Sequence, residues 1–293
     1  MKVEIRCASC ILHRGYMEIK EVTSDPSLQF KAMSSLIHFL AKEFKPTANP
    51  AYLGTQRDRL IKRITGNQDP YAERKRMGNK NALEMLPLAK NMVSNETSKE
   101  LRFRKACLCS IVGNVIEFDI PDNPFEYTDL QKLIQRAEED LAIDEITKIF
   151  DKARKAKNIL YLADNAGEIV FDTLLVQELK KLGAHVTVAV KGGPVLNDAT
   201  MEDAKHVGMH EAADDIVTTG TDAVGLIPSE CSDEFLSAYN SADFVVAKGM
   251  GYAETLSEIH LAAPHALLLR TKCSPVANFF NVSLGRNVAK LIF

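Results

Sequence analysis

The chain has 293 residues, of which 46% are hydrophobic and 26% charged, and its formal net charge is −3. This composition is typical of a globular protein with one large or two smaller domains, and without an excess of basic residues it does not favour a nucleic-acid partner. No apolar run approaches the ~20 residues that span a bilayer, and no signal peptide opens the chain, so we expect a cytoplasmic protein without membrane contact and with reduced thiols.

The first half of the sequence has helical periodicity almost throughout. Apolar side chains recur at spacings of three and four residues in five segments: 28–44, 81–92, 101–116, 130–141 and 143–153. Pro87 should kink or restart the second of these helices. The pattern predicts a mostly helical region over residues 1–156.

After residue 157 the pattern changes to short apolar runs, which are typical of strands buried on both faces. These runs span four segments: 158–163, 185–190, 242–247 and 266–269. Between the first two, residues 168–182 carry the apolar stripe of a helix that ends before Gly183. Strand, helix and strand in this order form a βαβ unit. We therefore predict that residues 157–293 form an α/β domain with a doubly wound, mainly parallel sheet, packed against the helical region.

Polar residues follow each predicted strand. The four segments that follow them are Asp164–Glu168, Lys191–Asp198, Lys248–Glu254 and Arg270–Cys273. Ligands of open parallel sheets bind beyond the carboxyl ends of the strands. We therefore expect these four segments to meet at one edge of the sheet.

Three side chains of this edge suit a divalent cation. Asp164 and Asp198 offer carboxylates and Asn165 a carbonyl oxygen, the ligands that Mg²⁺, Mn²⁺, Co²⁺ or Ni²⁺ accept. A cation would remove the repulsion between the two carboxylates and would polarise a phosphoryl oxygen. The sequence predicts a metal site at these residues, with both aspartates in catalysis.

Other groups of the same edge suit a phosphate. Lys248 and Lys272 are point charges for phosphate oxygens, and Gly167 could donate a backbone N–H at the start of the next helix. Glu254 could act as a general base for water, or could hold Lys248. Taken singly, Asp164-Asn165 and Asp198 could be helix caps, and the lysines could be solvated. Their joint placement favours a phosphate-handling site.

The same segments carry a family resemblance. Their order and spacing resemble those of the damage-control phosphatases, once called domain of unknown function 89, over most of the chain: Asp164–Glu168, Lys191–Thr200, Met201–Ala204, Lys248–Glu254 and Lys272-Cys273. The start, Cys7-Ala-Ser-Cys10, is similar to the subgroup that carries an N-terminal Cys-x-x-Cys.

The resemblance implies a helical region packed on a Rossmann-like domain and a divalent-metal-dependent phosphatase. It implies that Asp164, Asn165 and Asp198 bind the metal and that Lys248 and Lys272 meet the substrate phosphate. The implied substrates are small phosphate esters: sugar phosphates and damaged or surplus phosphometabolites, including pantetheine phosphate and its oxidised forms.

In the helical half the resemblance runs through Gly113–Phe118 and implies an active-site role for Asn114. A buried, hydrogen-bonded asparagine at a helix end is the alternative. Glu117 stands where the family more usually has aspartate, which leaves its role open. Met250 and Tyr252 stand where the family more often has polar residues, so the substrate preference could differ.

The cysteines form two close pairs, Cys7/Cys10 and Cys107/Cys109. They could be free thiols, could bind a structural metal at Cys7/Cys10 or jointly as four zinc ligands, or could be redox-active. Cys231 and Cys273 are expected to be buried. The dispersed histidines form no ligand pair at zinc-binding spacing, so a zinc hydrolase is not expected.

Three functions compete at this stage. The first is a metal-dependent phosphatase. The second is an S-adenosylmethionine-dependent methyltransferase, because doubly wound sheets often bind adenosine cofactors. Against it, no G-x-G-x-x-G follows the first predicted strand. The third is a phosphometabolite-binding protein without turnover. The oligomeric state is not indicated by the sequence.

Overall fold

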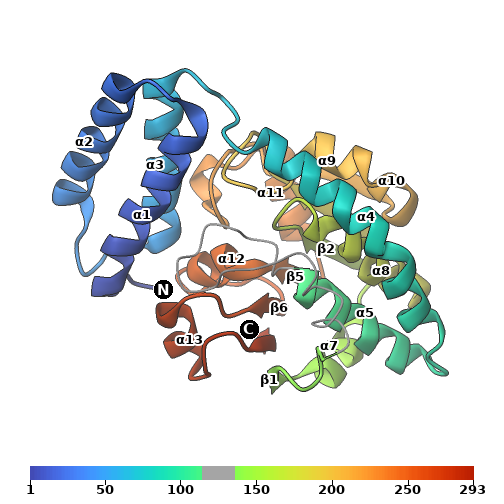
Figure 1. Ribbon diagram of the computed structural model, residues 1–293. Helices are drawn as coiled ribbons and strands as arrows, with labels where there is room; N and C mark the ends of the chain where they lie inside the picture. The colour runs from blue at the N-terminus through green and yellow to red at the C-terminus, as the bar shows by residue number, and fades with distance from the viewer. Residues whose placement is uncertain (114–135) are drawn as a thin grey trace.

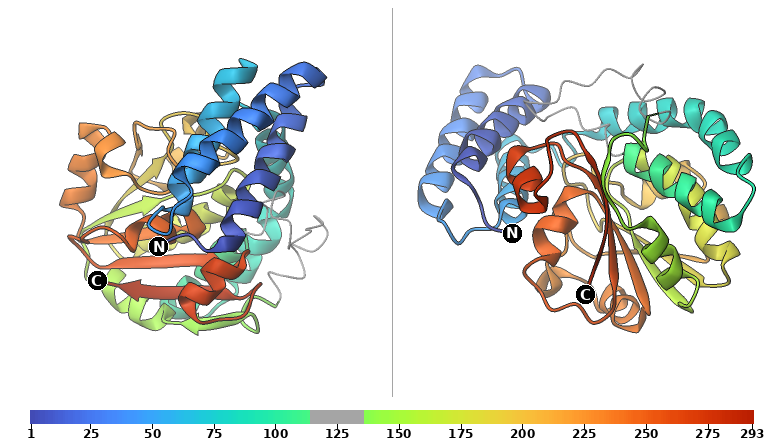
Figure 2. Two further views of the ribbon diagram at one scale, coloured as in Figure 1. Left: turned by 90° about the vertical axis from the view of Figure 1, so that its left-hand side faces the viewer. Right: turned by 90° about the horizontal axis from the view of Figure 1, so that it is seen from below.

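The structure is a computed structural model that describes residues 1–113 and 136–293. Three helices form a bundle that stands beside the rest of the described chain, as both views of Figure 2 show. They are α1 (Ile5–Val22), α2 (Pro26–Glu43) and α3 (Pro50–Thr65). We call this bundle the cap. The remaining elements form an α/β part (Figure 1).

The cap helices begin and end where local chemistry dictates. The side chain of Asp25 accepts a hydrogen bond from the backbone of Ser27 at the start of α2, and Asn49 does the same at the start of α3. A proline follows each of these caps, where its missing N–H costs no helical hydrogen bond. The bundle buries a small core of its own, which includes Leu36, Leu53 and Ile61.

The described residues form a seven-stranded sheet of order β1-β7-β6-β5-β2-β3-β4. The strands are β1 (Leu141–Asp144), β2 (Asn158–Leu162), β3 (His185–Val190), β4 (Asp215–Thr218), β5 (Phe244–Lys248), β6 (His265–Arg270) and β7 (Asn287–Ile292). From β4 to β6 all neighbours are parallel, whereas β7 runs antiparallel to β6 and parallel to β1. The predicted doubly wound, mainly parallel sheet is therefore confirmed.

Helices cover both faces of the sheet because its strands are apolar on both sides. In β2, Ile159 and Tyr161 belong to one core and Leu160 and Leu162 to the other. The first core is completed by α4 (Ala72–Ser94), α5 (Lys99–Gly113), α7 (Ile146–Ala153), α8 (Glu168–Lys181), α9 (Met201–His206) and α10 (Met209–Ala212). The second is completed by α11 (Asp233–Ser241), α12 (Gly249–Leu256) and α13 (Ser274–Phe280); a short 3₁₀ helix spans Pro228–Glu230.

Several boundaries differ from the predicted ones. The segment predicted as a helix over 143–153 becomes a helix only at Ile146, because Leu141–Asp144 pairs with β7 as an edge strand. Pro87 lies inside α4 without ending it. Of the predicted helix over 130–141, residues 130–135 lie outside the described residues, and the described remainder is not helical: 136–140 form turns and β1 begins at Leu141. The predicted domain boundary at residue 156 stays a prediction. β1 precedes this boundary in the chain but belongs to the sheet.

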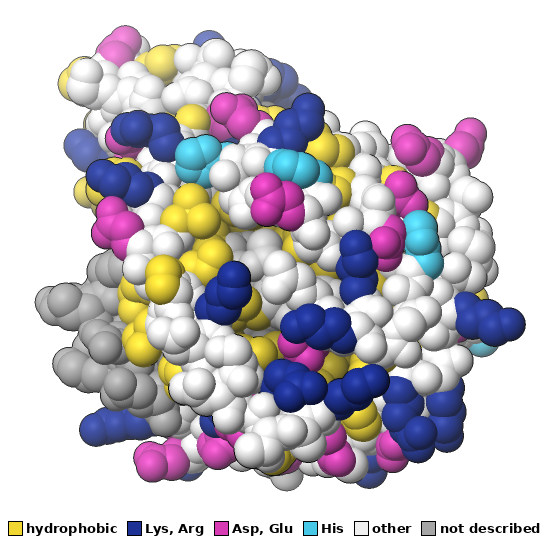
Figure 3. All heavy atoms as spheres, turned by 90° about the vertical axis from the view of Figure 1, so that its right-hand side faces the viewer, with side chains coloured by type: hydrophobic (Ala, Val, Ile, Leu, Met, Phe, Trp, Pro, Cys, Tyr) yellow, Lys and Arg dark blue, Asp and Glu magenta, His cyan; other side chains and the backbone are white. Residues whose placement is uncertain are grey.

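Charged residues are mixed over the face that Figure 3 shows. Lysines and arginines lie among aspartates and glutamates on this face. Ion pairs of the described residues include Arg154 with Asp151 at 2.8 Å and Lys180 with Asp214 at 3.0 Å. In the part of the chain that the structure describes, no helix has the length and apolar character needed to cross a membrane.

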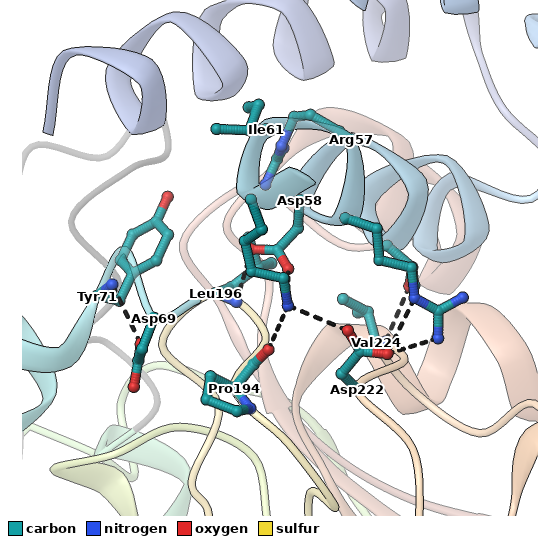
Figure 4. Close-up of polar contacts among 12 residues, drawn as sticks. Arg57, Asp58, Ile61, Asp69, Tyr71, Pro194, Leu196, Asp222 and Val224 are labelled. Carbon is teal, nitrogen blue, oxygen red and sulfur yellow. Dashed lines mark hydrogen bonds and ion pairs between the residues drawn. The ribbon is translucent and has the colours of Figure 1, made fainter. Parts of the chain in front are cut away.

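Charged contacts hold the cap against the α/β part. Beneath α3, Lys62 Nζ donates to Pro194 O at 2.6 Å and to Asp222 Oδ2 at 3.0 Å. Arg59 donates to Asp222 Oδ1 at 2.7 Å, and the backbone N–H of Leu196 donates to Asp58 at 3.2 Å. Figure 4 shows Asp58, Pro194, Leu196 and Asp222 facing one another across this junction. The position of the cap over the sheet therefore depends on directional polar contacts.

Candidate active site at the carboxyl edge of the sheet

The carboxyl ends of β2 and β5 mark the point at which the strand order reverses. The chain continues from β2 to β3 on one side, and β5 lies on the other side. Open α/β sheets bind ligands at such a switch point. Asp164 and Asn165 follow β2 after the single residue Ala163, and Lys248 is the last residue of β5.

Backbone hydrogen bonds bring Asp198 beside Asp164 and Asn165. The N–H of Ala199 donates to Asp164 O at 2.7 Å, and the N–H of Ala166 donates to Asn197 O at 2.8 Å. Asn165 and Asp198 thus form an isolated antiparallel bridge. The structure brings together the three residues that the sequence predicts as metal ligands.

Two features orient this trio. Asn165 Nδ2 donates to Asp164 Oδ2 at 2.9 Å and to Glu168 Oε2 at 3.0 Å, which directs the amide oxygen away from both carboxylates. Gly249 lies against Asp164 with φ of +80°, and a Cβ there would stand 1.8 Å from Asp164 Oδ2. The glycine therefore leaves the room that the Asp164 carboxylate occupies.

The donor chemistry fits a hard divalent cation. Two carboxylates and one amide oxygen are oxygen ligands, and they would leave coordination positions for water and substrate, as Mg²⁺ and similar ions prefer. Among the described residues no three His, Cys, Asp or Glu side chains gather as a metal site. A cation at this edge would therefore depend on the amide of Asn165 and on non-protein ligands as well as on the two aspartates.

Lys248 lies behind the trio, in a fully buried polar network. Its ammonium donates to Ser110 O and to Asp172 Oδ1, both at 2.9 Å, and forms an ion pair with Glu168. Burial would lower the pKa of Lys248, but the charges of Asp172 and Glu168 outweigh this and raise it. Burial raises the pKa of Glu168 against the opposing charge of Lys248. Contact of Lys248 with a phosphate stays a prediction. In this structure its ammonium forms an ion pair with Glu168.

Two other groups predicted to contact a phosphate, the Gly167 N–H and the Lys272 ammonium, are also buried in the protein. The N–H of Gly167 donates to Asn79 Oδ1 at 2.6 Å, so contact with a phosphate would replace that bond. Lys272 is 1% exposed, and its charge lowers the pKa of Glu168. Their roles stay predictions. Asn114 and Glu117 lie outside the described residues.

Lys191 is a buried cation that the sequence reading did not single out. Its Nζ lies 3.6 Å from Asp198 Oδ2, 2.9 Å from Gly225 O and 4.6 Å from the centre of the Tyr252 ring. From the sequence alone, a lysine beside two glycines is expected to be exposed to solvent. The fold instead places its charge beside that of Asp198. Tyr252 is itself fully buried against Lys191.

A cavity of about 520 Å³ separates the cap from the sheet edge. Its α/β wall includes three carboxylate residues and one amide: Asp164, Asp198, Glu254 and Asn165. Its cap wall includes three arginines: Arg6, Arg14 and Arg57. The two walls therefore differ in the sign of their charge, and this volume lies within the ~300–1,000 Å³ of small-molecule sites.

Arg57 is the most buried of these arginines, at 1% exposure. Its Nε lies 3.2 Å from Glu18 Oε2, while its Nη2 has no hydrogen-bond partner among the described residues. Burial raises the pKa of Glu18 to about 8, against the opposing charge of Arg57. Burial therefore disfavours the charged form of Glu18 beside the Arg57 guanidinium.

Leu196 connects the cap to the loop that carries Asp198. It lines the cavity two residues before Asp198 and has a φ of 46°, in the left-handed region that side chains rarely adopt. The bond from its N–H to Asp58 of α3 holds it there. Backbone strain at this point is typical of binding sites.

Three thiols line the same cavity: Cys7, Cys10 and Cys273. Burial raises the pKa of Cys273 to about 12 and also raises the pKa of Cys7. Cys107 and Cys109 lie in α5, on the other side of the molecule from α1 in Figure 1, so the two pairs do not form a joint four-thiol site. A metal at Cys7/Cys10 alone stays a prediction.

Comparisons with known proteins identify the family and the fold. The sequence pattern of the damage-control phosphatase ARMT1-like domain matches residues 3–288. A protein of Archaeoglobus fulgidus named damage-control phosphatase is 38% identical over the full length of both chains. Another damage-control phosphatase, from Pyrococcus horikoshii, is 34% identical over 97% of this chain and 96% of its own.

One further relative and one solved structure extend the comparison. An uncharacterized protein of Methanocaldococcus jannaschii is 39% identical over 98% of this chain and 95% of its own. The crystal structure of the Pyrococcus horikoshii protein, described there as a DUF89 family protein, superposes with a TM-score of 0.86 at 34% identity, over 99% of this chain and 98% of that one. The fold and the family resemblance read from the sequence are confirmed; the Cys-x-x-Cys subgroup stays a prediction.

Proposed function

Because the chain belongs to the damage-control phosphatase ARMT1-like domain family, we propose that it hydrolyses phosphate monoesters of small metabolites with the help of a divalent cation at Asp164, Asn165 and Asp198. The observation that carries the proposal is the cavity between the two walls. Oxygen ligands at the sheet edge face arginines of the cap. A phosphate ester suits such a cavity because its oxygens can contact a cation on one side and guanidinium groups on the other.

The cation, when bound, would polarise the phosphoryl group and lower the pKa of a coordinated water. The chain's own residues position the reactants. Asn165 holds Asp164 through its amide, and Glu168 and Lys248 hold Asn165 from behind. Lys191 offsets the charge of Asp198. These contacts fix the geometry before substrate enters, which is what makes electrostatic catalysis effective.

We further propose that Glu254 accepts the proton of the attacking water. It lines the cavity from α12 together with Cys7 and Cys273, and its charge raises the pKa of both thiols, which supports this role. Direct attack by water is favoured over an aspartyl-phosphate because both aspartates are needed as metal ligands. The cavity volume leaves room for a metabolite body beyond the phosphate, such as a sugar or pantetheine unit.

The deciding experiment is hydrolysis of p-nitrophenyl phosphate by metal-stripped protein, with Mg²⁺, Mn²⁺, Co²⁺ or Ni²⁺ added back. We expect no phosphate release in chelator and restored release with at least one of these ions. Asp164→Ala should lower kcat/KM at least ~10²-fold. Asp151→Asn, an exposed aspartate of α7, is the matched control and should not change it.

The outcomes separate the competing functions. Undiminished turnover in Asp164→Ala contradicts the proposed mechanism. Formation of S-adenosylhomocysteine from S-adenosylmethionine without phosphate release supports a methyltransferase instead. Metal-dependent binding of phosphate esters without hydrolysis supports a binding protein. A panel of sugar phosphates and pantetheine phosphates then ranks the substrates.

A further inference from the structure

A single buried asparagine of the helical half touches both loops of the candidate metal site. Asn79 lies in α4 and is 2% exposed. Its Oδ1 accepts a hydrogen bond from the backbone N–H of Gly167 at 2.6 Å. Its Nδ2 donates to Asp203 Oδ1 at 2.8 Å. The orientation of this amide is determined by its partners, since a backbone N–H can only donate and a carboxylate accepts.

Each partner of Asn79 belongs to a segment that carries proposed metal ligands. Gly167 follows Asp164-Asn165 within the same tight turn and is the N-cap of α8. Asp203 lies in the first turn of α9, which begins just after Asp198. Asn79 therefore links the two segments through its one amide group.

Asp203 is held from its other side as well. Its Oδ2 accepts hydrogen bonds from the backbone N–H and the hydroxyl of Thr200, at 2.9 and 2.8 Å. One oxygen of Asp203 thus closes the first turn of α9, and the other is bound by Asn79. Because both oxygens are engaged, a shift of Asn79 would be passed to the start of α9 and to the Asp198 loop before it.

The α4 backbone approaches the Gly167 turn too closely to slide over it. Gly167 has φ of +78°, and a Cβ there would stand 3.1 Å from the carbonyl carbon and oxygen of Gly78. This contact and the Asn79 hydrogen bonds fix α4 on the turn. Helix α4, which precedes the sheet in the chain, therefore takes part in the geometry of a site whose proposed ligands all follow β2 and β3.

We propose that Asn79 is a positioning residue that sets the separation of Asp164-Asn165 from Asp198 and thereby the affinity of the site for a divalent cation. This inference rests on the proposed function. Groups that orient metal ligands from behind typically change metal affinity by ~10–100-fold when they are removed. Asn79 would act on the ligands indirectly, through the backbone N–H of Gly167 on one side and through the Asp203 cap of α9 on the other.

Exchanging the two side chains gives a sharp test. In Asn79→Asp two carboxylates, which can only accept hydrogen bonds, face each other. In Asp203→Asn two amide NH₂ groups, which can only donate, face each other. In the double variant, Asp at 79 accepts from both Gly167 N–H and the new amide at 203, whose oxygen still accepts from Thr200. Donors and acceptors match again only in the double variant.

The measurement is calorimetric titration of metal-free protein with MnCl₂. We expect each single variant to bind Mn²⁺ ~10–100-fold more weakly than the wild type, and the double variant to recover to within a few-fold. Asn91→Asp, an exposed position of the same helix, should bind as the wild type does. In turnover assays the Mn²⁺ concentration for half-maximal rate should change more than kcat.

Wild-type Mn²⁺ affinity in both single variants overturns the inference. So does a folded double variant, judged by its melting temperature, that binds as weakly as the single variants. A wild-type protein that hydrolyses phosphate esters without binding Mn²⁺ overturns the inference but leaves the phosphatase activity standing. A wild type that neither binds Mn²⁺ nor hydrolyses phosphate esters contradicts the proposed function as well.

Discussion

Lys248 at the end of β5 and Glu168 at the start of α8 form an ion pair that is closed to solvent on both sides. Glu168 also accepts from Asn165, so the pair lies one hydrogen bond behind the proposed metal ligands. A buried pair of this kind does not contribute much net stability by itself, because both charges lose their hydration. Removal of only one partner is costly, because the other charge then stays buried without its counter-charge. The role of the pair can therefore be measured.

Lys248→Met is expected to destabilise the protein by about 3–5 kcal/mol, because it leaves Glu168 and Asp172 buried without their cation. Adding Glu168→Gln should recover part of that loss, since one of the two carboxylates is then neutral. Urea unfolding of both variants measures the difference. Equal stability of the single and double variants would show that the pair is not coupled.

Gly249→Ala is expected to lower both Mn²⁺ affinity and kcat/KM about 10-fold or more. The new methyl group would stand 1.8 Å from Asp164 Oδ2, and the carboxylate would have to move. Gly183→Ala is the matched control. Gly183 also has a positive φ, of +101°, but no atom within 4 Å of the built Cβ, so it carries the backbone strain of about 1–2 kcal/mol without the clash. Equal loss of metal affinity in both variants would contradict this explanation.

Asp222→Asn is expected to loosen the cap in a pH-dependent way. Burial would raise the pKa of Asp222, but hydrogen bonds from Arg59 and Lys62 outweigh it and lower the pKa. The stabilising contribution is therefore present above the unfolded-state pKa of about 3.9 and is lost as the pH falls through the lower folded-state value. We expect a loss of about 1–2 kcal/mol near pH 7 that vanishes in strong acid.

The measurement for Asp222→Asn is the free energy of unfolding as a function of pH. Asp151→Asn removes an exposed ion pair with Arg154 and should change stability by less than about 0.5 kcal/mol at any pH. A constant difference between Asp222→Asn and the wild type across the acid range would rule out the ionised carboxylate as the cause.

Arg57 is expected to contribute to substrate binding rather than to metal binding. Because its removal alone would leave Glu18 buried and unpaired, the informative variant is Arg57→Met with Glu18→Gln, compared with Glu18→Gln alone. We expect the KM for p-nitrophenyl phosphate to rise about 10-fold or more, as for the loss of a charged hydrogen bond, with Mn²⁺ affinity unchanged. An unchanged KM would show that the cap wall does not contact the ester.

The central strands and the polar loops after them could be predicted because both signals are local. A run such as Asn158–Leu162 is buried on both faces, and its apolar composition says so. The edge strands β1 and β4, and β7 between β1 and β6, were missed because they are partly exposed and carry polar residues such as Asp215 and Lys290. Apolar runs therefore identify the centre of this sheet and not its edges.

The site was predictable as a set of residues but not as a geometry. The positions of Asp164, Asn165 and Asp198 follow from strand ends, whereas the direction of the Lys248 side chain depends on carboxylates of α8. Asn79 and Arg57 lie on helices whose periodicity fixes a buried face but not the partner of that face. Contacts between distant segments, such as Asn79 with Gly167, have no signature in one sequence.

The pairing of β1 with β7 has a consequence for the order of folding. β2, α8 and β3 are contiguous and can assemble from local contacts, whereas β1 finds its neighbour only after β7, the last strand, is available. Contacts between segments so far apart in sequence are slow to form. We therefore expect the β1 edge to dock late, and the apolar side of α7 to remain open to aggregation until β7 is in place.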